Sequence, residues 1–384
     1  MFWLLTIIFL FWAIILVDFH KGFKNLPSID HLPFRDEKSL ISVIIAAKDE
    51  EKSIKQTIET LLDQKYVNLE ILAVNDRSTD STGSIIENLA AQHANVHAIT
   101  IETLPSGWLG KNHALHIGAQ QAKGTYLLFT DADIYFHENV VSQAITFLKN
   151  ENLDHLTAAP NLRAGSFFLK GLISFFLFGF GYLKRPWTAN HPSKKGGMGV
   201  GAFQLLTNAC YEGIGGHHAI RFRPDDDLAM GLRIKKLGYR QNLVTALHSL
   251  SVEWYPDLPS AFKGFEKNAF AGLNYSVLFA LLAITGVFTS QILPFITIWS
   301  SRLPLQMISA FTIVLLFYLY ALTMRHLTTY SNWIVFGLPI FALLFIYMLS
   351  RALLLTFLRG GIEWRGSRYS LKELKKYYRN SEEE

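Results

Sequence analysis

The stretch Ile41-Ser-Val-Ile-Ile-Ala-Ala-Lys-Asp-Glu-Glu51 joins a continuous apolar run to a group of acidic side chains. Residues 41–46 have the composition of a strand that is buried on both faces of a parallel sheet. The following segment, 52–62, places its apolar side chains on one face at helical spacing. A buried strand followed by an amphipathic helix predicts the first unit of an α/β fold.

The same alternation continues along the chain. Apolar runs at 69–74, 95–101 and 126–130 predict further strands, and segments 78–91 and 110–122 predict the helices between them. Strands and helices that alternate in this way build a mostly parallel sheet with helices on both faces. Ligands of such sheets bind beyond the carboxyl ends of the strands, so the residues at those ends are the candidates for function.

Acidic residues follow several of the predicted strands. Asp49 and Glu50 follow the strand at 41–46, Asp76 follows the next strand, and the pair Asp131 and Asp133 follows the run at 126–130. Two carboxylates one residue apart occur in many turns, but this pair ends an apolar strand and two other acidic strand ends precede it. Carboxylate oxygens suit Mg²⁺ or Mn²⁺ when substrate phosphates complete the coordination shell. The pattern predicts a divalent metal site at Asp131 and Asp133.

Two further groups of polar residues suggest chemistry. Asp225-Asp226-Asp227 precedes an amphipathic segment, and three carboxylates exceed what capping a helix requires. Crowded like charges raise the pKa of at least one carboxyl group, which suits a general base. Lys111 begins a predicted helix, where an ammonium group beside backbone N–H groups can neutralise phosphate oxygens. The glycine-rich stretch 196–201 lacks the context of a dinucleotide fingerprint and is interpreted as a flexible loop at an acceptor site.

The composition excludes several classes of protein. The chain has 384 residues, of which 50% are hydrophobic and only 17% are charged, so a disordered chain is excluded. Cys210 is the single cysteine, which excludes a disulfide scaffold. The net charge of +5 is not gathered into a basic stripe with interleaved aromatic residues, so no nucleic-acid partner is expected. The basic residues instead flank apolar segments, as they do in membrane proteins.

The apolar residues gather at the two ends of the chain. Residues 1–17 carry no charge and lack the basic start and the small-residue cleavage site of a signal peptide, so we expect an uncleaved anchor. Lys21 and Lys24 follow the anchor and place the next segment in the cytoplasm. Uncharged runs at 268–301, 303–324 and 327–350 are each at least about 20 residues long, enough for a membrane span.

These segments predict the layout of the chain. Three simple crossings after the anchor would leave the basic tail outside, so we expect the run that holds Pro294 to be re-entrant or a broken hairpin. We interpret the aromatic stretch 166–182 as a helix that lies at the membrane interface, with a buried core helix or a fifth span as alternatives. The predicted parts are an anchor (1–20), an α/β domain (38–255), an interfacial helix (256–273), a membrane region of three or four segments (274–356) and a basic cytoplasmic tail (357–384).

The motifs, taken in order, resemble those of the family 2 glycosyltransferases of GT-A fold. The similarity covers most of residues 40–270. Among the members of that family, the chain looks most like membrane-bound enzymes that glucosylate lipids, such as the bacterial carotenoid-acid (diaponeurosporenoate) glycosyltransferases. The motifs are Ile44-Ile-Ala-Ala-Lys-Asp-Glu-Glu51, Val74-Asn-Asp-Arg-Ser-Thr-Asp80, Gly110-Lys-Asn-His-Ala-Leu115, Asp131-Ala-Asp133, Gly215-Gly-His217, Asp226-Asp227 with Gly231-Leu-Arg233, and the tail Gly361-Ile-Glu-Trp-Arg-Gly-Ser-Arg-Tyr-Ser370.

The resemblance implies a GT-A domain and a role for each matching residue. Asp227 would be the base that deprotonates the acceptor, with Asp226 in the place of the family's Glu. The metal, Mg²⁺ or Mn²⁺, would act as a Lewis acid on the leaving diphosphate. The nucleotide-sugar contacts would come from Asp49, Glu50, Asp76, Lys111 and Asp131, and the metal contacts from Asp131 and Asp133.

The implied activity is an inverting transfer of a hexose, in the first place glucose, from a UDP-sugar to a lipid-soluble acceptor. The enzyme would be a multi-pass protein of the cell (inner) membrane with its catalytic domain in the cytoplasm. Two alternatives stay open: a processive polysaccharide synthase, and a polyprenyl-phosphate sugar transferase whose acceptor needs no strong base. The chain departs from the family pattern in three places, with Lys48-Asp49 where Arg-Asn is common, Arg77 in the place of a glycine, and no Gln-x-x-Arg-Trp motif.

Overall fold

The computed structural model describes residues 1–271, 276–359, 361–364 and 367–370. Within it the chain forms two compact units, each assembled from separate stretches of sequence. We call them the sheet unit, which comprises residues 22–162 and 185–252, and the helical unit, which comprises residues 1–21, 163–184 and 253–384.

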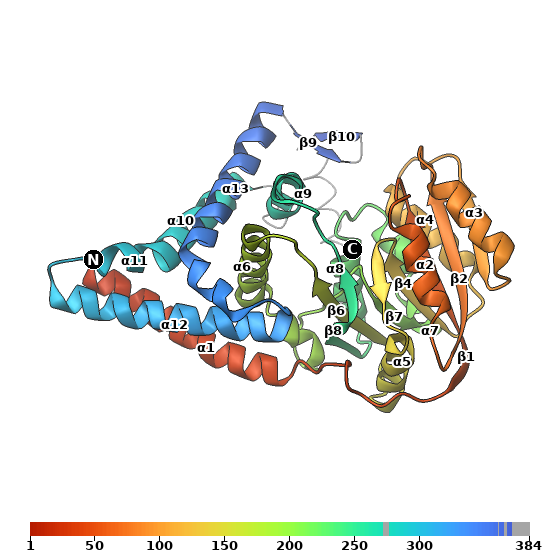
Figure 1. The fold of residues 1–384 in the computed structure, drawn as a ribbon, viewed down its shortest axis with the longest axis horizontal. Coiled ribbons are helices and arrows are strands. Elements are labelled where there is room, and N and C mark those ends of the chain that lie inside the picture. The colour runs from red at the N-terminus through yellow and green to blue at the C-terminus, as the bar shows by residue number, and fades with distance from the viewer. Residues whose placement is uncertain (272–275, 360, 365–366, 371–384) are drawn as a thin grey trace. The chain divides into compact units, whose positions relative to one another are not determined.

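The sheet unit is built on one sheet of eight strands (Figure 1). The strands lie in the order β3-β2-β1-β4-β7-β6-β8-β5, and the first four of this order are parallel. Beyond them β7 runs antiparallel to β4 and β6, β8 is parallel to β6, and β5 is antiparallel to β8. The strands are β1 (Glu37–Ala47), β2 (Val67–Asp76), β3 (Val96–Ile101), β4 (Tyr126–Asp131), β5 (Ile134–Phe136), β6 (His155–Leu162), β7 (Gln204–Thr207) and β8 (Gln241–Val252).

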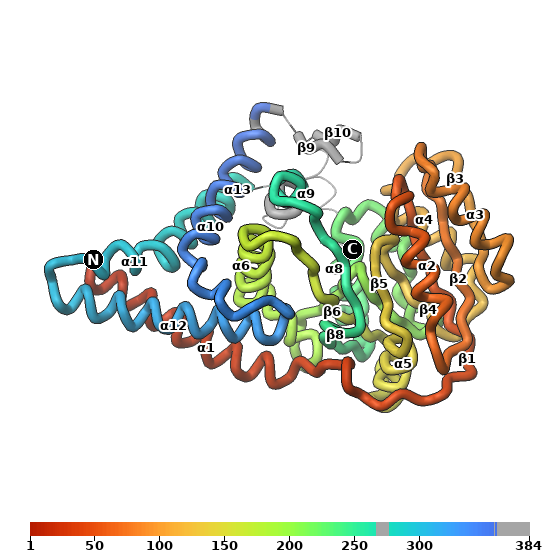
Figure 2. Tube along the Cα trace, viewed as in Figure 1, coloured from red at the N-terminus to blue at the C-terminus, as the bar shows by residue number. Residues whose placement is uncertain are grey.

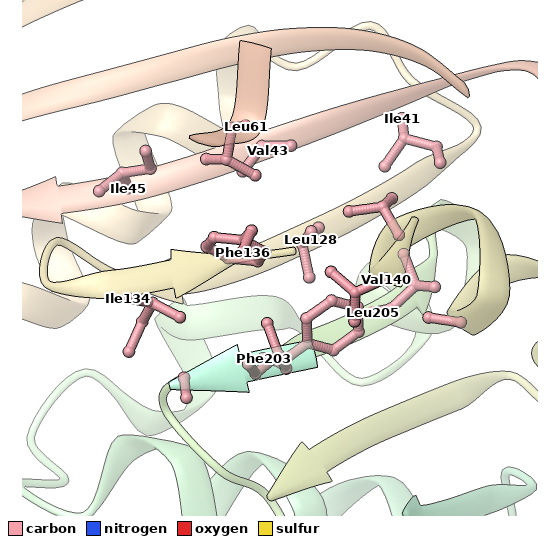
Figure 3. Close-up of a cluster of buried hydrophobic side chains, with 14 of the residues drawn as sticks. Ile41, Val43, Ile45, Leu61, Leu128, Ile134, Phe136, Val140, Phe203 and Leu205 are labelled. Atoms are coloured by element: carbon pink, nitrogen blue, oxygen red, sulfur yellow. The ribbon is translucent and has the colours of Figure 1, made fainter. Parts of the chain in front are cut away.

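Helices pack on both faces of this sheet because successive side chains of its inner strands point to opposite faces. On one face Ile41, Val43 and Ile45 of β1 pack in a core with α2 (Ile54–Leu62), α3 (Thr82–Gln92) and α5 (Val140–Asn150) (Figure 3). On the other face Ile44 joins a core shared with α4 (Gly110–Gln121), α7 (Asn208–Gly213) and α8 (Asp226–Lys236). Two short 3₁₀ helices, η1 (Pro186–Asn190) and η2 (Gly216–Ile220), complete the unit. The expected α/β alternation from residue 41 to residue 131 is confirmed.

The register of the parallel strands brings their carboxyl ends to one level. Ala47 of β1 lies opposite Asn75 of β2, and Ala46 lies opposite Asp131 of β4. From β1 the chain continues to β2 on one side and later returns to β4 on the other side. Such a reversal of strand order opens a crevice outside the strand ends, where ligands of α/β sheets bind.

The helical unit gathers helices from both ends of the chain and one from its middle (Figure 2). Five helical segments of the described chain are long and apolar enough to cross a membrane, by length and composition: Phe2–Lys24, Phe167–Lys184, Val277–Thr297, Leu303–Leu327 and Asn332–Thr356. The elements are α1 (Phe2–Lys24), α6 (Phe167–Lys184), α9 (Leu258–Ala271), α10 (Val277–Val287), a π-helical turn η3 (Phe288–Ile292), α11 (Leu293–Thr297), α12 (Leu303–Leu327), a 3₁₀ turn η4 (Asn332–Gly337), α13 (Leu338–Arg359) and the hairpin of β9 (Gly361–Trp364) and β10 (Ser367–Ser370).

The aromatic stretch at 166–182 forms α6, and α6 packs with the other apolar helices. Its Gly171 lies so close to α13 that an added Cβ would come within 2.0 Å of the Phe341 ring. Ser174 Oγ and the Tyr320 hydroxyl of α12 share a hydrogen bond of 2.6 Å. Trp12 of α1 stacks on Phe178 with ring centroids 5.5 Å apart. The helix is therefore part of the helical unit, although its sequence interrupts the sheet unit.

The run that holds Pro294 forms one bent helical segment from α10 through η3 to α11. Its described part does not double back on itself. The bend has an identifiable cause, because a π-helical turn ends where Pro294 removes a backbone N–H from the helix. Residues 272–275 of the run lie outside the described residues, so the re-entrant or broken hairpin and the number of membrane crossings stay predictions.

Candidate active site

The loops that follow β1 and β2 are joined by side-chain hydrogen bonds. Asp49 Oδ1 accepts from the backbone N–H of Thr79 at 2.7 Å, and the Asp49 N–H donates to Ser78 Oγ at 3.1 Å. One residue further on, the Glu50 N–H donates to Thr82 Oγ1 at 2.8 Å. These bonds fix the acidic loop after β1 against the loop after β2. Asp49 and Glu50 therefore lie at one edge of the sheet beside the end of β2, where Asp76 lies.

Two residues of these loops have left-handed backbones, which is costly for any residue that carries a Cβ. Asp49 has φ of 55° and Arg77 has φ of 56°. The Arg77 guanidinium holds the Asp76 carboxylate in a two-pronged ion pair, with Nε 2.8 Å from Oδ1 and Nη2 3.0 Å from Oδ2. Asp76 is only 2% exposed. Glycine is common where a chain must adopt this backbone, so the conformation has an energetic cost at Arg77.

Lys111 joins the metal-type pair to the acidic cluster before α8. Its Nζ lies 2.9 Å from Asp131 Oδ1 and 3.1 Å from Asp226 Oδ2. These two carboxylates raise the pKa of Lys111 despite its burial, so the ammonium stays charged. Lys111 at the start of α4 and Asp226 at the start of α8, which are 115 positions apart in sequence, are thus brought together with Asp131 at the end of β4. The sequence analysis placed Asp131, Asp226 and Lys111 in the site, and it did not predict that Lys111 pairs with both carboxylates.

Asp133 lies at the exposed edge of the same site, one turn beyond the end of β4. Protein atoms packed around the carboxyl group, together with the negative charges of Asp131 and Glu50, raise its pKa to about 7. The positive charge of Lys111 opposes this rise in the pKa of Asp133 and does not cancel it. The predicted metal residues are therefore brought together with Glu50 nearby.

The three consecutive aspartates have three separate partners. Asp225 pairs with Arg223 through two hydrogen bonds of 2.8 and 2.7 Å, and Asp226 pairs with Lys111. Asp227 instead accepts from backbone N–H groups, those of Gly201 at 3.0 Å and Leu228 at 2.8 Å. Burial and the neighbouring charge of Asp226 raise the pKa of Asp227 to about 7. A carboxylate that titrates near neutral pH can accept a proton from a hydroxyl group in a reaction.

The glycine-rich loop at 196–201 is packed between the two acidic groups. The Gly201 carbonyl accepts from the Asp131 N–H at 3.1 Å, while the Gly201 N–H donates to Asp227. A Cβ on Gly199 would lie 1.9 Å from the Asp227 carbonyl oxygen, and one on Gly201 would lie 2.6 Å from Asp131 Oδ2. The loop is closely packed against Asp131 and Asp227, which differs from the flexible acceptor loop that we expected. Its alternating glycines were the visible signal for this close approach.

The residues present fit a divalent cation of the kind that the sequence predicts. Asp131, Asp133 and Glu50 are oxygen donors, and the raised pKa of Asp133 shows that this group favours added positive charge. Within the described residues no group of three or more His, Cys, Asp or Glu side chains forms a complete metal cage. A cation at this point would therefore take further ligands from phosphate oxygens or water, as Mg²⁺ sites commonly do.

The comparisons with known proteins bear on this site. Residues 42–210 match the model of the family described as glycosyl transferase family 2. A 4,4'-diaponeurosporenoate glycosyltransferase from Staphylococcus haemolyticus is 31% identical over 122 residues, which is 32% of this chain and 32% of that protein. A UDP-Glc:alpha-D-GlcNAc-diphosphoundecaprenol beta-1,3-glucosyltransferase from Escherichia coli is 34% identical over 114 residues, which is 30% of this chain and 43% of that protein. The aligned part thus spans less than half the length of these relatives.

A solved structure shares the fold. A mannosyltransferase from Pyrobaculum calidifontis, solved in complex with GDP-Man and Mn²⁺, superposes with a TM-score of 0.55 at 16% identity and covers 91% of this chain and 99% of that one. This likeness and the sheet order confirm the expected GT-A-like fold, with a mostly parallel sheet and added apolar helices. Residues 42–210 therefore form a domain of glycosyl transferase family 2.

Proposed function

We propose that this protein transfers a hexose, in the first place glucose, from a UDP-sugar to a lipid-soluble acceptor at a membrane. The observation that carries the proposal is the convergence of Asp131, Asp133, Lys111 and Asp227 at the carboxyl ends of the parallel strands. The family match and the apolar helices support it. The relatives named for carotenoid-acid and undecaprenol-linked substrates agree with a lipid acceptor.

In this proposal the donor lies across the crevice outside β1. The uridine is bound at the ends of β1 and β2, by Asp49, Glu50 and Asp76. Lys111 and Asp131 lie toward the diphosphate and the sugar. Asp131 and Asp133 hold Mg²⁺ or Mn²⁺, which supplies Lewis-acid stabilisation of the leaving diphosphate when it is bound.

Asp227 is the proposed general base, and Asp226 is its neighbour in the catalytic pair. A hydroxyl or carboxyl group of the acceptor loses its proton to Asp227 as the acceptor oxygen attacks the anomeric carbon, and the configuration at that carbon inverts. The backbone N–H groups of Gly201 and Leu228 keep the Asp227 carboxylate in one orientation. Since Asp226 is neutralised by Lys111, Asp227 is the carboxylate of the pair that we expect to receive the proton.

The proposed location is the cell (inner) membrane, with a multi-pass anchor and the catalytic domain in the cytoplasm. The five apolar helical segments support membrane association. Lys21 and Lys24, at the end of α1, favour the cytoplasmic side for the chain that follows. The predicted parts at 1–20, 38–255, 256–273, 274–356 and 357–384 stay a prediction, as does the cytoplasmic tail, most of which lies outside the described residues. Lys263 is exposed on α9, and the side chain of Lys267 lies outside the described residues.

The proposal is tested by donor turnover in purified full-length protein. UDP release from UDP-glucose is measured in detergent with Mn²⁺, with and without a membrane lipid extract. We expect release that depends on the extract and a new glycolipid by mass spectrometry. Asp133→Asn and Asp227→Asn should each lower turnover by at least about a hundredfold, while Asp63→Asn, which changes an exposed carboxylate outside the site, should not. Full activity of Asp227→Asn would contradict the proposed base and would favour a phosphate acceptor. Long polymeric product would indicate a processive synthase.

A further inference from the structure

One residue of the glycine-rich loop is bonded to both the proposed metal-holding residue and the proposed base. The Asp131 N–H donates to the Gly201 carbonyl at 3.1 Å, and the Gly201 N–H donates to Asp227 Oδ2 at 3.0 Å. The place of Gly201 therefore fixes the spacing between Asp131 and Asp227. Whatever holds Gly201 in place also holds these two residues in register.

Thr157 of β6 holds the turn at Gly201 through its hydroxyl group. Thr157 Oγ1 accepts from the Val200 N–H at 2.9 Å and donates to the Phe203 carbonyl at 2.9 Å. The Phe203 N–H donates in turn to the Val200 carbonyl at 3.0 Å, which closes the turn. Thr157 is 0% exposed, so these bonds are shielded from solvent. One buried hydroxyl group therefore joins both ends of the turn to the sheet.

Gln241 of β8 joins the same loop to α8. Its Oε1 accepts from the Met198 N–H at 2.8 Å, and its Nε2 donates to the Gly231 carbonyl at 2.7 Å. A Cβ on Gly231 would lie 2.2 Å from the Met198 carbonyl oxygen, so the loop and the helix are in direct contact there. Asp227 lies in the first turn of this helix. One buried amide therefore holds the loop against the helix that carries the proposed base.

The chemistry of these two side chains points to a role at the loop. Amide and hydroxyl groups are costly to bury, and methionine or valine of similar shape would fill the same space without that cost. Among the described residues, every hydrogen bond of the two side chains goes to the backbone of the loop or of α8. Satisfying buried backbone groups alone would affect stability, whereas holding Gly201 in place affects the reaction as well.

We propose that Thr157 and Gln241 are positioning residues of the transfer reaction, which act on Asp131 and Asp227 through the loop at 198–203. Thr157 sets the place of the turn that bonds to both aspartates, and Gln241 sets the place of the loop against α8. This proposal rests on the proposed function, which assigns the roles of Asp131 and Asp227. The contribution of the two side chains is alignment, since a displacement of about 1 Å can slow a reaction about a hundredfold.

The test compares Thr157→Val, which removes the hydroxyl group, with Thr157→Ser, which keeps it. UDP release from UDP-glucose is measured with Mn²⁺ and a membrane lipid extract, using the full-length protein in detergent. We expect Thr157→Val to lower kcat at least about tenfold. The KM for UDP-glucose should change little, because the residues proposed to bind the uridine lie on the loops after β1 and β2. Thr157→Ser should retain most of the wild-type kcat.

The pH profile separates positioning from stability. Loss of the Gly201 N–H bond should raise the pKa of Asp227, because that bond favours the ionised carboxylate. The decrease of kcat/KM at low pH should therefore move to higher pH in Thr157→Val and stay in place in Thr157→Ser. The charged side chains that act on Asp227 are unchanged in both variants: Asp226, Lys111 and Asp131.

Thr146→Val is the matched control for the loss of a buried hydroxyl group. Thr146 is 6% exposed on α5, on the face of the sheet opposite to α8, and its Oγ1 accepts from the Arg35 N–H at 3.1 Å. This variant should lower the melting temperature and leave kcat and the pH profile as in the wild type. If Thr157→Val does not fold, Gln241→Met carries the test, with the same expected loss of kcat and the same shift of the pH profile.

Two results would overturn the inference and leave the proposed function standing. One is a wild-type kcat and pH profile in Thr157→Val, with a lower melting temperature as its only change. The other is an equal loss of kcat in Thr157→Ser and Thr157→Val, since the hydroxyl group is then not what positions the loop. A wild type that releases no UDP from UDP-glucose overturns the proposed donor itself.

Discussion

Replacing Lys111 by Met removes the ammonium group that joins Asp131 to Asp226 while keeping most of the apolar stem. The Asp226 carboxylate is 10% exposed and lies 3.1 Å from Nζ, so it stays behind as a buried charge without its cation. Breaking a buried pair in this way costs about 3–5 kcal/mol. We add no free energy for the loss of the Lys111–Asp131 pair, because Asp131 is 37% exposed and solvent screens its charge. At about 2–4 °C per kcal/mol for a unit of this size, the melting temperature should fall by roughly 6–20 °C.

The pH dependence of this loss has a defined sign. Burial raises the pKa of Asp226, and the charge of Lys111 lowers it. Without Lys111 the folded-state pKa rises further above the unfolded value of about 3.9. The native variant then holds a proton that the unfolded chain releases, so its stability is fully present below about pH 4 and falls as the pH rises through the raised pKa. The raised pKa of Lys111 in the wild type stabilises equally at pH 5 and pH 7.5, because both lie below about 10.4.

The assay is thermal unfolding of the detergent-purified protein at pH 5 and pH 7.5, with Asp226→Asn added to the variant as the matched rescue. We expect a larger deficit at pH 7.5 than at pH 5, and recovery of stability without recovery of transfer in the double variant. A Lys111→Met protein that melts with the wild type at pH 7.5 would refute the reasoning. So would a double variant no more stable than the single one, since the cost is assigned to the unpaired Asp226.

Three further outcomes follow from the site and the helical unit. Gly201→Ala should lower turnover and Mn²⁺ affinity at least about tenfold, because the new Cβ would lie 2.6 Å from Asp131 Oδ2 and would displace this carboxylate. Gly165→Ala is the control, because an added Cβ there meets open space. In a pH profile of the wild type, kcat/KM should decrease as the pH is lowered past about 7, because Asp227 takes up a proton. Asp226→Asn should move this decrease to lower pH, because it removes a negative charge that raises the pKa of Asp227. Gly171→Ala should destabilise the packing of α6 on α13 by about 1–3 kcal/mol in thermal unfolding, whereas Gly286→Ala, which meets nothing within 4 Å, should not.

Much of the fold was predictable because its signals are local. The run at 41–46 reads as a doubly buried strand, and it became the interior of β1 between β2 and β4. The alternation that follows it predicted the parallel strands and the helices between them. The second half of the sheet was not predicted, because β7 and β6 join the sheet antiparallel and from distant parts of the chain. Pairings of that kind depend on tertiary contacts that leave no period in the sequence.

The aromatic helix at 167–184 illustrates the same limit. Its composition fits an interfacial helix, a buried helix and a membrane span equally well. The helices that pack against it are determined by particular side-chain contacts, such as the close approach of Gly171 to Phe341 and the hydrogen bond between Ser174 and Tyr320. Small residues at a helix contact let two backbones approach closely, but a sequence does not say which helix will use the space.

The candidate site too was predicted in part from the sequence. Its carboxylates were visible because each one follows an apolar run, and a strand end is a place that the sequence can locate. Lys111 was predicted as a site residue, but its pairing with Asp226, which lies 115 positions away, was not. The ion pair of Arg77 with Asp76 was not predicted either, because it forms in a loop whose backbone is left-handed at Arg77. The substitution of Arg77 for an expected glycine was the one visible sign of the second pair. The left-handed backbone of Arg77 and its two hydrogen bonds to Asp76 are properties of the folded loop, which the sequence does not display.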